Sequence, residues 1–140
     1  MKTKMIKKFI ALSLAVFVMA SHMVSAYALT DHYTDTWTEN KVTGKIYYTL
    51  GNPNYRTFWA STSADRRYGY ISASILLESA ETNAFISKNE AYGHNLDYAD
   101  TYAYVNYGQT VTVRVTSTHE AGSSKGDITT AFRLIKVYAL

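Results

Sequence analysis

The sequence predicts an all-β fold, a small antiparallel β-sandwich or barrel of about seven strands that follows a cleaved signal peptide. Three observations support this prediction. Apolar and polar residues alternate with a period of two along several runs of the chain. Turn residues separate these runs at the spacing of hairpins. Thirteen of the 140 residues are tyrosines, a residue type that is enriched in strands.

The first residues have the organisation of a secretory signal peptide. Four lysines among the first eight residues form a basic head, and a short apolar run follows over Phe9–Ala20. That run is shorter than the ~20 residues that a helix needs to cross a bilayer. Small residues then offer two cleavage positions, before Tyr27 or before Leu29. We prefer the second, which makes residues 1–28 the signal peptide and 29–140 a single secreted β domain. The alternative is a permanent N-terminal anchor.

Removal of the leader changes the charge of the chain. The full sequence has 14 basic and 11 acidic residues, and four of the basic residues lie in the leader. The secreted domain therefore has a net charge of about −1 when its histidines are neutral. Nucleic acid is bound by basic surfaces that displace its counterions, so we expect no nucleic-acid partner. All four methionines also leave with the leader, and the chain has no cysteine, so its stability must come from its core.

The alternating runs define the predicted strands. The clearest run is TVTVRVT, in which three valines face one side and polar side chains face the other. In chain order, the predicted strands are Val42–Leu50, Arg56–Ser61, Ile71–Leu77, Ala84–Ser87, Thr101–Tyr107, Thr110–Thr116 and Thr130–Leu140. Leu29–Asn40 lacks a clear period and is predicted to be an arm or an edge strand. Ile75–Ala84 also fits a helical face, so one or two turns of helix are an alternative there.

The last predicted strand, Thr130–Leu140, is apolar on both faces apart from Arg133 and Lys136. A strand of this kind either lies centrally in a sheet or pairs with another chain. We therefore expect Ile135 to lie in the core. Pairing with a second copy of the chain through this strand, which would form a homo-oligomer, is the other interpretation.

The densest polar stretch is Asn89–Asp100, NEAYGHNLDYAD. Its candidate calcium ligands are the side-chain oxygens of Glu90, Asn95, Asp97 and Asp100. Calcium takes about six to eight oxygen ligands, and several of them could come from one loop of a β-sandwich. No established ion motif matches the stretch, so we favour the alternative of a solvated connector in which Asn and Asp cap turns. No cofactor other than this calcium ion is predicted.

Two further groups of residues would form a metal site or a catalytic site if folding brought their side chains together. His94 and the neighbouring aspartates offer one nitrogen ligand, whereas zinc needs three or four close nitrogen or sulfur ligands. His119 precedes Ser123 and Asp127 in a flexible Gly-rich loop, and such residues form the triad of serine hydrolases when they are in contact. The chain lacks the G-x-S-x-G nucleophile elbow. We therefore predict no catalytic residue, and a small secreted hydrolase is only the third interpretation.

Aromatic residues are concentrated in two parts of the domain. Exposed Trp and Tyr side chains give a large rigid contact area at low entropic cost, and they stack on sugars or on partner surfaces. The alternative is that tyrosines simply occupy strand positions with their hydroxyls in water. The candidate binding residues are Trp37, Tyr55, Trp59, Tyr102 and Tyr104.

These observations favour a secreted, non-enzymatic protein that acts outside the cell by binding a cell-envelope component, a polysaccharide or a surface protein. The alternative is a carbohydrate-binding module with an aromatic platform and a calcium loop. The organisation of the chain resembles that of the lactococcin 972-type bacteriocins: a Lys-rich leader, no cysteine, and a short β domain rich in Tyr, Ser and Thr. The resemblance covers organisation and no individual motif. It implies a released antagonist from a Gram-positive bacterium.

Overall fold

The computed structural model describes residues 31–49 and 52–140, which form eight β-strands and no helix. The signal peptide predicted at residues 1–28 and its cleavage positions lie outside the described residues. The strands are β1 (Asp31–Glu39), β2 (Val42–Thr49), β3 (Tyr55–Tyr68), β4 (Tyr70–Ser79), β5 (Phe85–Gly93), β6 (Leu96–Asn106), β7 (Thr112–Ser124) and β8 (Asp127–Ala139). The predicted all-β class is confirmed.

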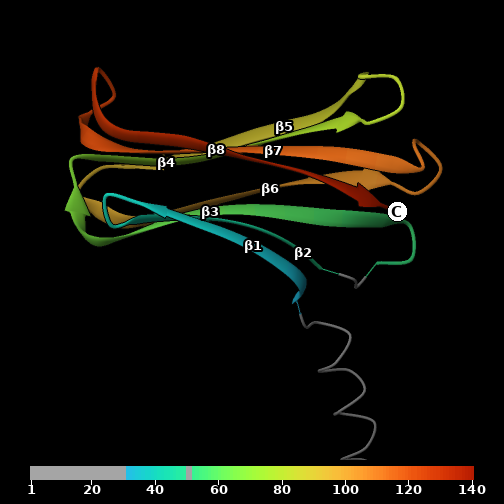
Figure 1. Cartoon of the computed structure of the whole chain (residues 1–140), viewed down its shortest axis with the longest axis horizontal. Helices are drawn as coiled ribbons and strands as arrows, with labels where there is room; N and C mark the ends of the chain where they lie inside the picture. Colours follow the sequence, from blue (N-terminus) through green and yellow to red (C-terminus); the bar gives the residue numbers. More distant parts are fainter. Residues whose placement is uncertain (1–30, 50–51) are drawn as a thin grey trace, which may run out of the picture. The chain divides into compact units, whose positions relative to one another are not determined.

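Two antiparallel sheets of four strands pack face to face (Figure 1). Sheet A has the order β1-β2-β3-β6, and sheet B has the order β5-β4-β7-β8. The chain passes from sheet A to sheet B between β3 and β4, returns between β5 and β6, and crosses again between β6 and β7. Each sheet has two free edges, so the fold is the sandwich of the prediction and not the barrel.

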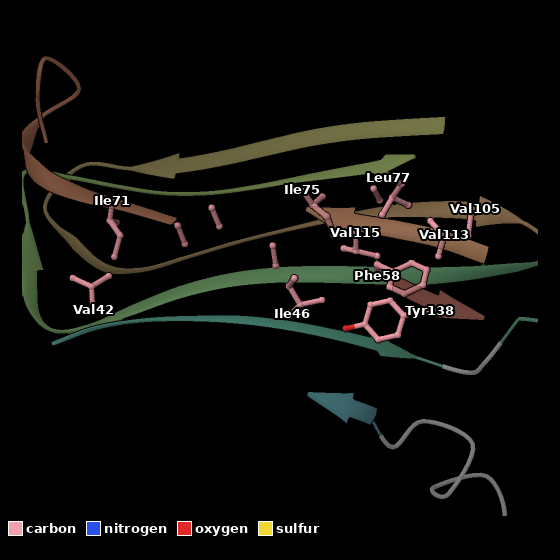
Figure 2. Packing of buried hydrophobic residues seen from close by; sticks show 14 of the residues in the cluster. Val42, Ile46, Phe58, Ile71, Ile75, Leu77, Val105, Val113, Val115 and Tyr138 are labelled. Carbon is pink, nitrogen blue, oxygen red and sulfur yellow. The ribbon is translucent and has the colours of Figure 1, made fainter. Parts of the chain in front are cut away.

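The core lies between the two sheets, and the two-residue period of the strands builds it. In β7, Val113 and Val115 point inward, and in β4, Ile75 and Leu77 do the same. All four side chains are fully buried. Figure 2 shows these side chains from sheet B meeting Phe58 and others from sheet A in one layer. Their burial is the main source of stability for a chain without disulfides.

Two local predictions differ from the structure. The helical alternative for Ile75–Ala84 is wrong, because β4 continues to Ser79 and pairs with both β5 and β7. The flexible Gly-rich loop predicted around Ser123 and Asp127 is wrong as well, since β7 and β8 stay paired until Ser124 lies opposite Asp127. The edge strand that was one alternative for Leu29–Asn40 is confirmed, because β1 lies at an edge of sheet A and adds one strand to the seven predicted.

The prediction of a central C-terminal strand is also wrong, because β8 is an edge strand of sheet B. Tyr138 points into the core, but Ile135 and Val137 are each 58% exposed on the outer face. No further layer covers that face among the described residues, so an apolar side chain there remains in solvent. The end of β8 is held by Arg56, whose Nη1 atom donates a hydrogen bond of 2.7 Å to the carbonyl oxygen of Ala139.

Candidate functional site

The outer face of sheet A carries a row of aromatic side chains across three strands. Ile46, Phe58 and Ala103 are buried, so their neighbours along the strands point to the opposite side. The strand register places Tyr47 of β2 opposite Trp59 of β3, and Trp59 opposite Tyr102 of β6. The three rings therefore form one row across the sheet.

The rings in this row are in contact. The ring centroids of Tyr47 and Trp59 are 6.0 Å apart with an interplanar angle of 2°, and those of Trp59 and Tyr102 are 4.9 Å apart. Nearby on the same face, the centroids of Tyr55 and Tyr104 are 5.4 Å apart. Tyr102 and Tyr104 are each about half exposed. We call these residues the aromatic face: Tyr47, Tyr55, Trp59, Tyr102 and Tyr104.

Trp37 does not belong to the aromatic face, although the sequence suggested it. Trp37 lies opposite Gly44 in the register of β1 and β2. A Cβ atom on Gly44 would point toward His119 of sheet B, so this register position faces the inner side of sheet A. Trp37 is 56% exposed there because β1 is an edge strand. Tyr47, in contrast, was missed, although the phase set by Val42 and Ile46 could have indicated it.

Polar side chains flank the aromatic row. The register aligns Lys45, Ser61 and Asp100 as the next row of the outer face. Opposite charges thus lie at the two ends of a row that runs parallel to the rings. Beside this row, burial and then the negative charge of Asp100 raise the pKa of Tyr98, which keeps its hydroxyl protonated. The face therefore combines ring surfaces with hydrogen-bonding groups, as saccharide-binding surfaces do.

The candidate calcium ligands are not brought together. Asn89–Asp100 is not a connector loop but the end of β5, a tight turn with Asn95 at φ 56°, and the start of β6. Glu90 lies opposite Ser74 on the outer face of sheet B, whereas Asp100 lies opposite Ser61 on the outer face of sheet A.

Asp97 is three residues before Asp100 on the same strand and therefore points to the other side of β6. Within the part of the chain that the structure describes, no three His, Cys, Asp or Glu side chains form a group that could hold a metal ion. Calcium binding stays a prediction that rests on composition alone, and His94 has no cluster of aspartates around it.

His119 is fully buried between the sheets and belongs to a hydrogen-bonded chain. Its Nδ1 atom is 2.8 Å from Oγ1 of Thr62, and its Nε2 atom is 2.7 Å from Oγ of Ser117. The Thr62 hydroxyl donates to the carbonyl oxygen of Ser72, at 2.7 Å, so it accepts from Nδ1–H. Nε2 then accepts from the Ser117 hydroxyl. This arrangement satisfies a neutral imidazole completely.

Burial lowers the pKa of His119 to about 4, so the ring is neutral at pH 7. Ser123 does not contact it and instead donates a hydrogen bond to Asp127 in the hairpin between β7 and β8. The serine hydrolase set considered from the sequence is therefore not assembled in the structure. His119 is a structural residue of the core.

The carboxylate of Glu81 accepts several hydrogen bonds, and no pattern in the sequence indicated this cluster. Glu81 lies in the turn after β4 and accepts hydrogen bonds from Ser79, from Thr110 and from both the backbone nitrogen and the hydroxyl of Thr112. These bonds, first that of Thr110, hold the pKa of Glu81 well below its usual range. Because these bonds join the β4–β5 turn to Thr110 and Thr112, we interpret Glu81 as a clamp between this turn and the start of β7.

The comparisons with known proteins give no match. No protein-family model, no curated protein sequence and no solved structure is similar to this chain. Within residues 31–49 and 52–140, no helix has the length and hydropathy needed to cross a membrane.

Proposed function

We propose that this chain is a secreted, non-enzymatic protein that binds a polysaccharide component of a cell envelope through its aromatic face. A released antagonist of other bacteria, similar in organisation to bacteriocins, is the biological role that fits this activity. The single observation that supports the proposal is the row of touching rings formed by Tyr47, Trp59 and Tyr102.

The chemistry of the aromatic face supports a saccharide ligand. Sugar rings present flat C–H surfaces that pack on aromatic rings, and their hydroxyls need hydrogen-bond partners at the periphery. Trp59 lies in the middle of the row, with Lys45 and Asp100 near its two ends. Half-exposed tyrosines lose little rotamer entropy on binding, because they have only two side-chain torsions.

A cosedimentation experiment tests the proposal. The purified chain is mixed with intact cell envelopes from several bacteria, and the bound fraction is measured against concentration. Tyr102→Ala should weaken binding about tenfold, which corresponds to about 1.4 kcal/mol. Tyr92→Ala is the matched control, because Tyr92 is 62% exposed on the outer face of sheet B. Equal loss in both variants would contradict the proposal.

A second pair of variants compares the contributions of the two tryptophans to envelope binding. Trp59→Ala should reduce binding strongly, whereas Trp37→Ala should leave it unchanged, since Trp37 lies apart from the aromatic face. Circular dichroism confirms that each variant is folded. If Trp37→Ala abolishes binding and Trp59→Ala does not, the ligand occupies the edge of sheet A near β1 instead.

Antagonism is tested by growth of a panel of related bacteria with the added chain, against a heat-unfolded control. Selective inhibition that Tyr102→Ala removes would support an antagonist acting through the aromatic face. Envelope binding without inhibition would favour the second candidate, a carbohydrate-binding module. That candidate draws its support from the same stacked rings, and binding that strengthens with added calcium would support its calcium loop.

Assembly through β8 belongs to the same proposal. Support comes from the position of β8 at an edge of sheet B and from the exposed side chains of Ile135 and Val137. Edge strands pair readily with another strand, and an apolar outer face extends such a contact. Two copies joined along β8 would present two aromatic faces to one envelope surface and so bind with higher avidity.

A further inference from the structure

A pocket of about 270 Å³ lies at the end of the sandwich where the β3–β4 connection meets the hairpin between β7 and β8. The passage from β3 to β4 contributes Arg66, Arg67, Tyr68 and Gly69. The hairpin between β7 and β8 contributes Gly122, Ser123 and Thr129. Two of these residues carry a positive charge and none carries a negative charge. The pocket is therefore basic, although the secreted domain as a whole is not.

Two glycines fix the shape of this pocket. A Cβ atom on Gly69 would lie 2.0 Å from the carbonyl oxygen of Ser123, and one on Gly122 would lie 2.1 Å from that of Asp127. The first contact packs the β3–β4 connection against the β7–β8 hairpin, backbone against backbone, and the second lies within that hairpin. Neither position leaves room for a larger residue. Because the walls are held by close backbone contact, the arginines extend from a rigid frame and not from a loose loop.

The positive charges of the pocket are not neutralised by ion pairs. The nearest acidic residue along β3 is Asp65, and its carboxylate pairs with the Lys41 amine at 3.3 Å. Among the described residues, neither Arg66 nor Arg67 takes part in an ion pair. The Arg66 guanidinium lies 5.0 Å from the centre of the Tyr68 ring, a cation–π contact that orients it. Both guanidinium groups retain their charge for an external anion.

The hydroxyls of the pocket already have protein partners. Ser123 donates to the carboxylate of Asp127, and Thr129 donates to the carbonyl oxygen of Ala121 at 3.2 Å. Recognition therefore falls to the arginines, whose planar guanidinium groups match the paired oxygens of phosphates and carboxylates. We propose that this pocket binds an oxyanion, a phosphate or carboxylate group, between Arg66 and Arg67. The proposal stands apart from the aromatic face and does not depend on the envelope ligand.

A titration followed by nuclear magnetic resonance tests the site. The full chain, labelled with ¹⁵N, is titrated with inorganic phosphate and separately with sodium acetate, each at constant ionic strength set by chloride. Saturable shifts of the Arg67, Gly69 and Gly122 amides are expected. Saturation by phosphate alone would assign a phosphate ligand, and saturation by acetate alone would assign a carboxylate. Shifts that stay linear with both anions would overturn the proposal.

Three variants define the role of the charges. Arg67→Gln should weaken the binding of the saturating anion at least about tenfold, because it removes one of the two guanidinium groups that would hold the anion. Arg133→Gln, which removes the same charge from the exposed face of β8, should leave the affinity unchanged. Asp127→Asn should strengthen binding about twofold to threefold, since it removes a negative charge that is bonded to Ser123 of the pocket. Equal weakening by Arg67→Gln and Arg133→Gln would show only general charge attraction and overturn the proposal.

Discussion

Two regions of the same core use the two-residue period of the strands in different ways. Around Phe58 the inward positions are apolar, with Leu77, Val115 and Tyr138 packed in contact (Figure 2). Further along β7 the inward positions are Ser117 and His119, which are just as deeply buried. The apolar region is stabilised by the area it removes from water, and the polar region by a completed chain of hydrogen bonds.

Burial alone therefore does not determine how a region of the core responds to pH. The packing of Phe58, Leu77 and Val115 is insensitive to protons, because none of these side chains titrates. The region around His119 is stable only while the imidazole is neutral, since protonation would place a second N–H donor against Ser117 and a charge in the core. One sandwich therefore contains a pH-insensitive part and a pH-sensitive part.

The largest expected effect comes from the apolar region. Leu77→Ala should destabilise the chain by about 3 kcal/mol, through lost burial and the cavity that remains. Chemical denaturation at pH 7 and at pH 5 should give the same loss, because no proton is linked to this site. A loss that differs by more than about 1 kcal/mol between the two pH values would contradict the division of the core.

The polar region should make the intact chain acid-sensitive. The pKa of His119 is about 4 when folded and 6.5 when unfolded, so the unfolded state takes up the proton first. Stability is complete above pH 6.5 and should fall by about 3 kcal/mol as the pH drops toward 4. Denaturation curves at half-unit steps of pH measure this slope.

Two variants check the source of that slope. His119→Gln should flatten it while lowering the stability at pH 7, whereas His94→Gln should leave it unchanged because His94 is exposed. Glu81 acts in a separate window. Its pKa is lowered in the folded state, so its contribution is lost only as the pH falls below 4.5. A slope that persists in His119→Gln would assign the acid sensitivity to another group.

A smaller effect is expected from Thr62→Val, which replaces the hydroxyl by a methyl group of similar size. The imidazole Nδ1 atom then loses its partner in the core. An unpaired buried polar atom costs about 1–3 kcal/mol, so the free energy of unfolding should decrease by that amount. Histidine resonances followed against pH show whether the His119 pKa moves as well, and an unchanged stability would mean that a water replaces the hydroxyl.

The smallest effect is expected outside the core, at Ile135. Because this side chain is 58% exposed, Ile135→Lys should change the stability by less than about 0.5 kcal/mol. Any association through β8 should be lost at the same time, as measured by sedimentation velocity. Unfolding of the variant would mean that Ile135 does lie in the core, as the sequence suggested.

Much of the fold follows from the sequence, because alternation is a local signal. Val113 and Val115 are buried as the pattern predicts, but Val111 is 74% exposed since β7 begins only at Thr112. The pairing of β3 with β6 could not be predicted, because two intervening strands belong to the other sheet. Alternation gives the face of a residue and not the partner of its strand.

Part of the candidate site could also be predicted, because alternation along a single strand shows which side chains share a face. Trp59 and Tyr102 lie on one face, and each could be assigned from its own strand. Their contact depends on register across a sheet, which the local pattern does not contain. The Arg66–Arg67 pocket could not be predicted, since it needs the close approach of the β3–β4 connection and the β7–β8 hairpin, which are far apart in the sequence.

The missing side chain of Gly44 has an evolutionary consequence. A Cβ atom there would lie 2.5 Å from the His119 ring and 2.7 Å from Phe132, so the imidazole occupies the space that a larger residue would need. Substitution at either position is therefore constrained by the other. In any descendant of this sequence we expect the two to covary: a side chain at position 44 should appear only together with a smaller residue at position 119.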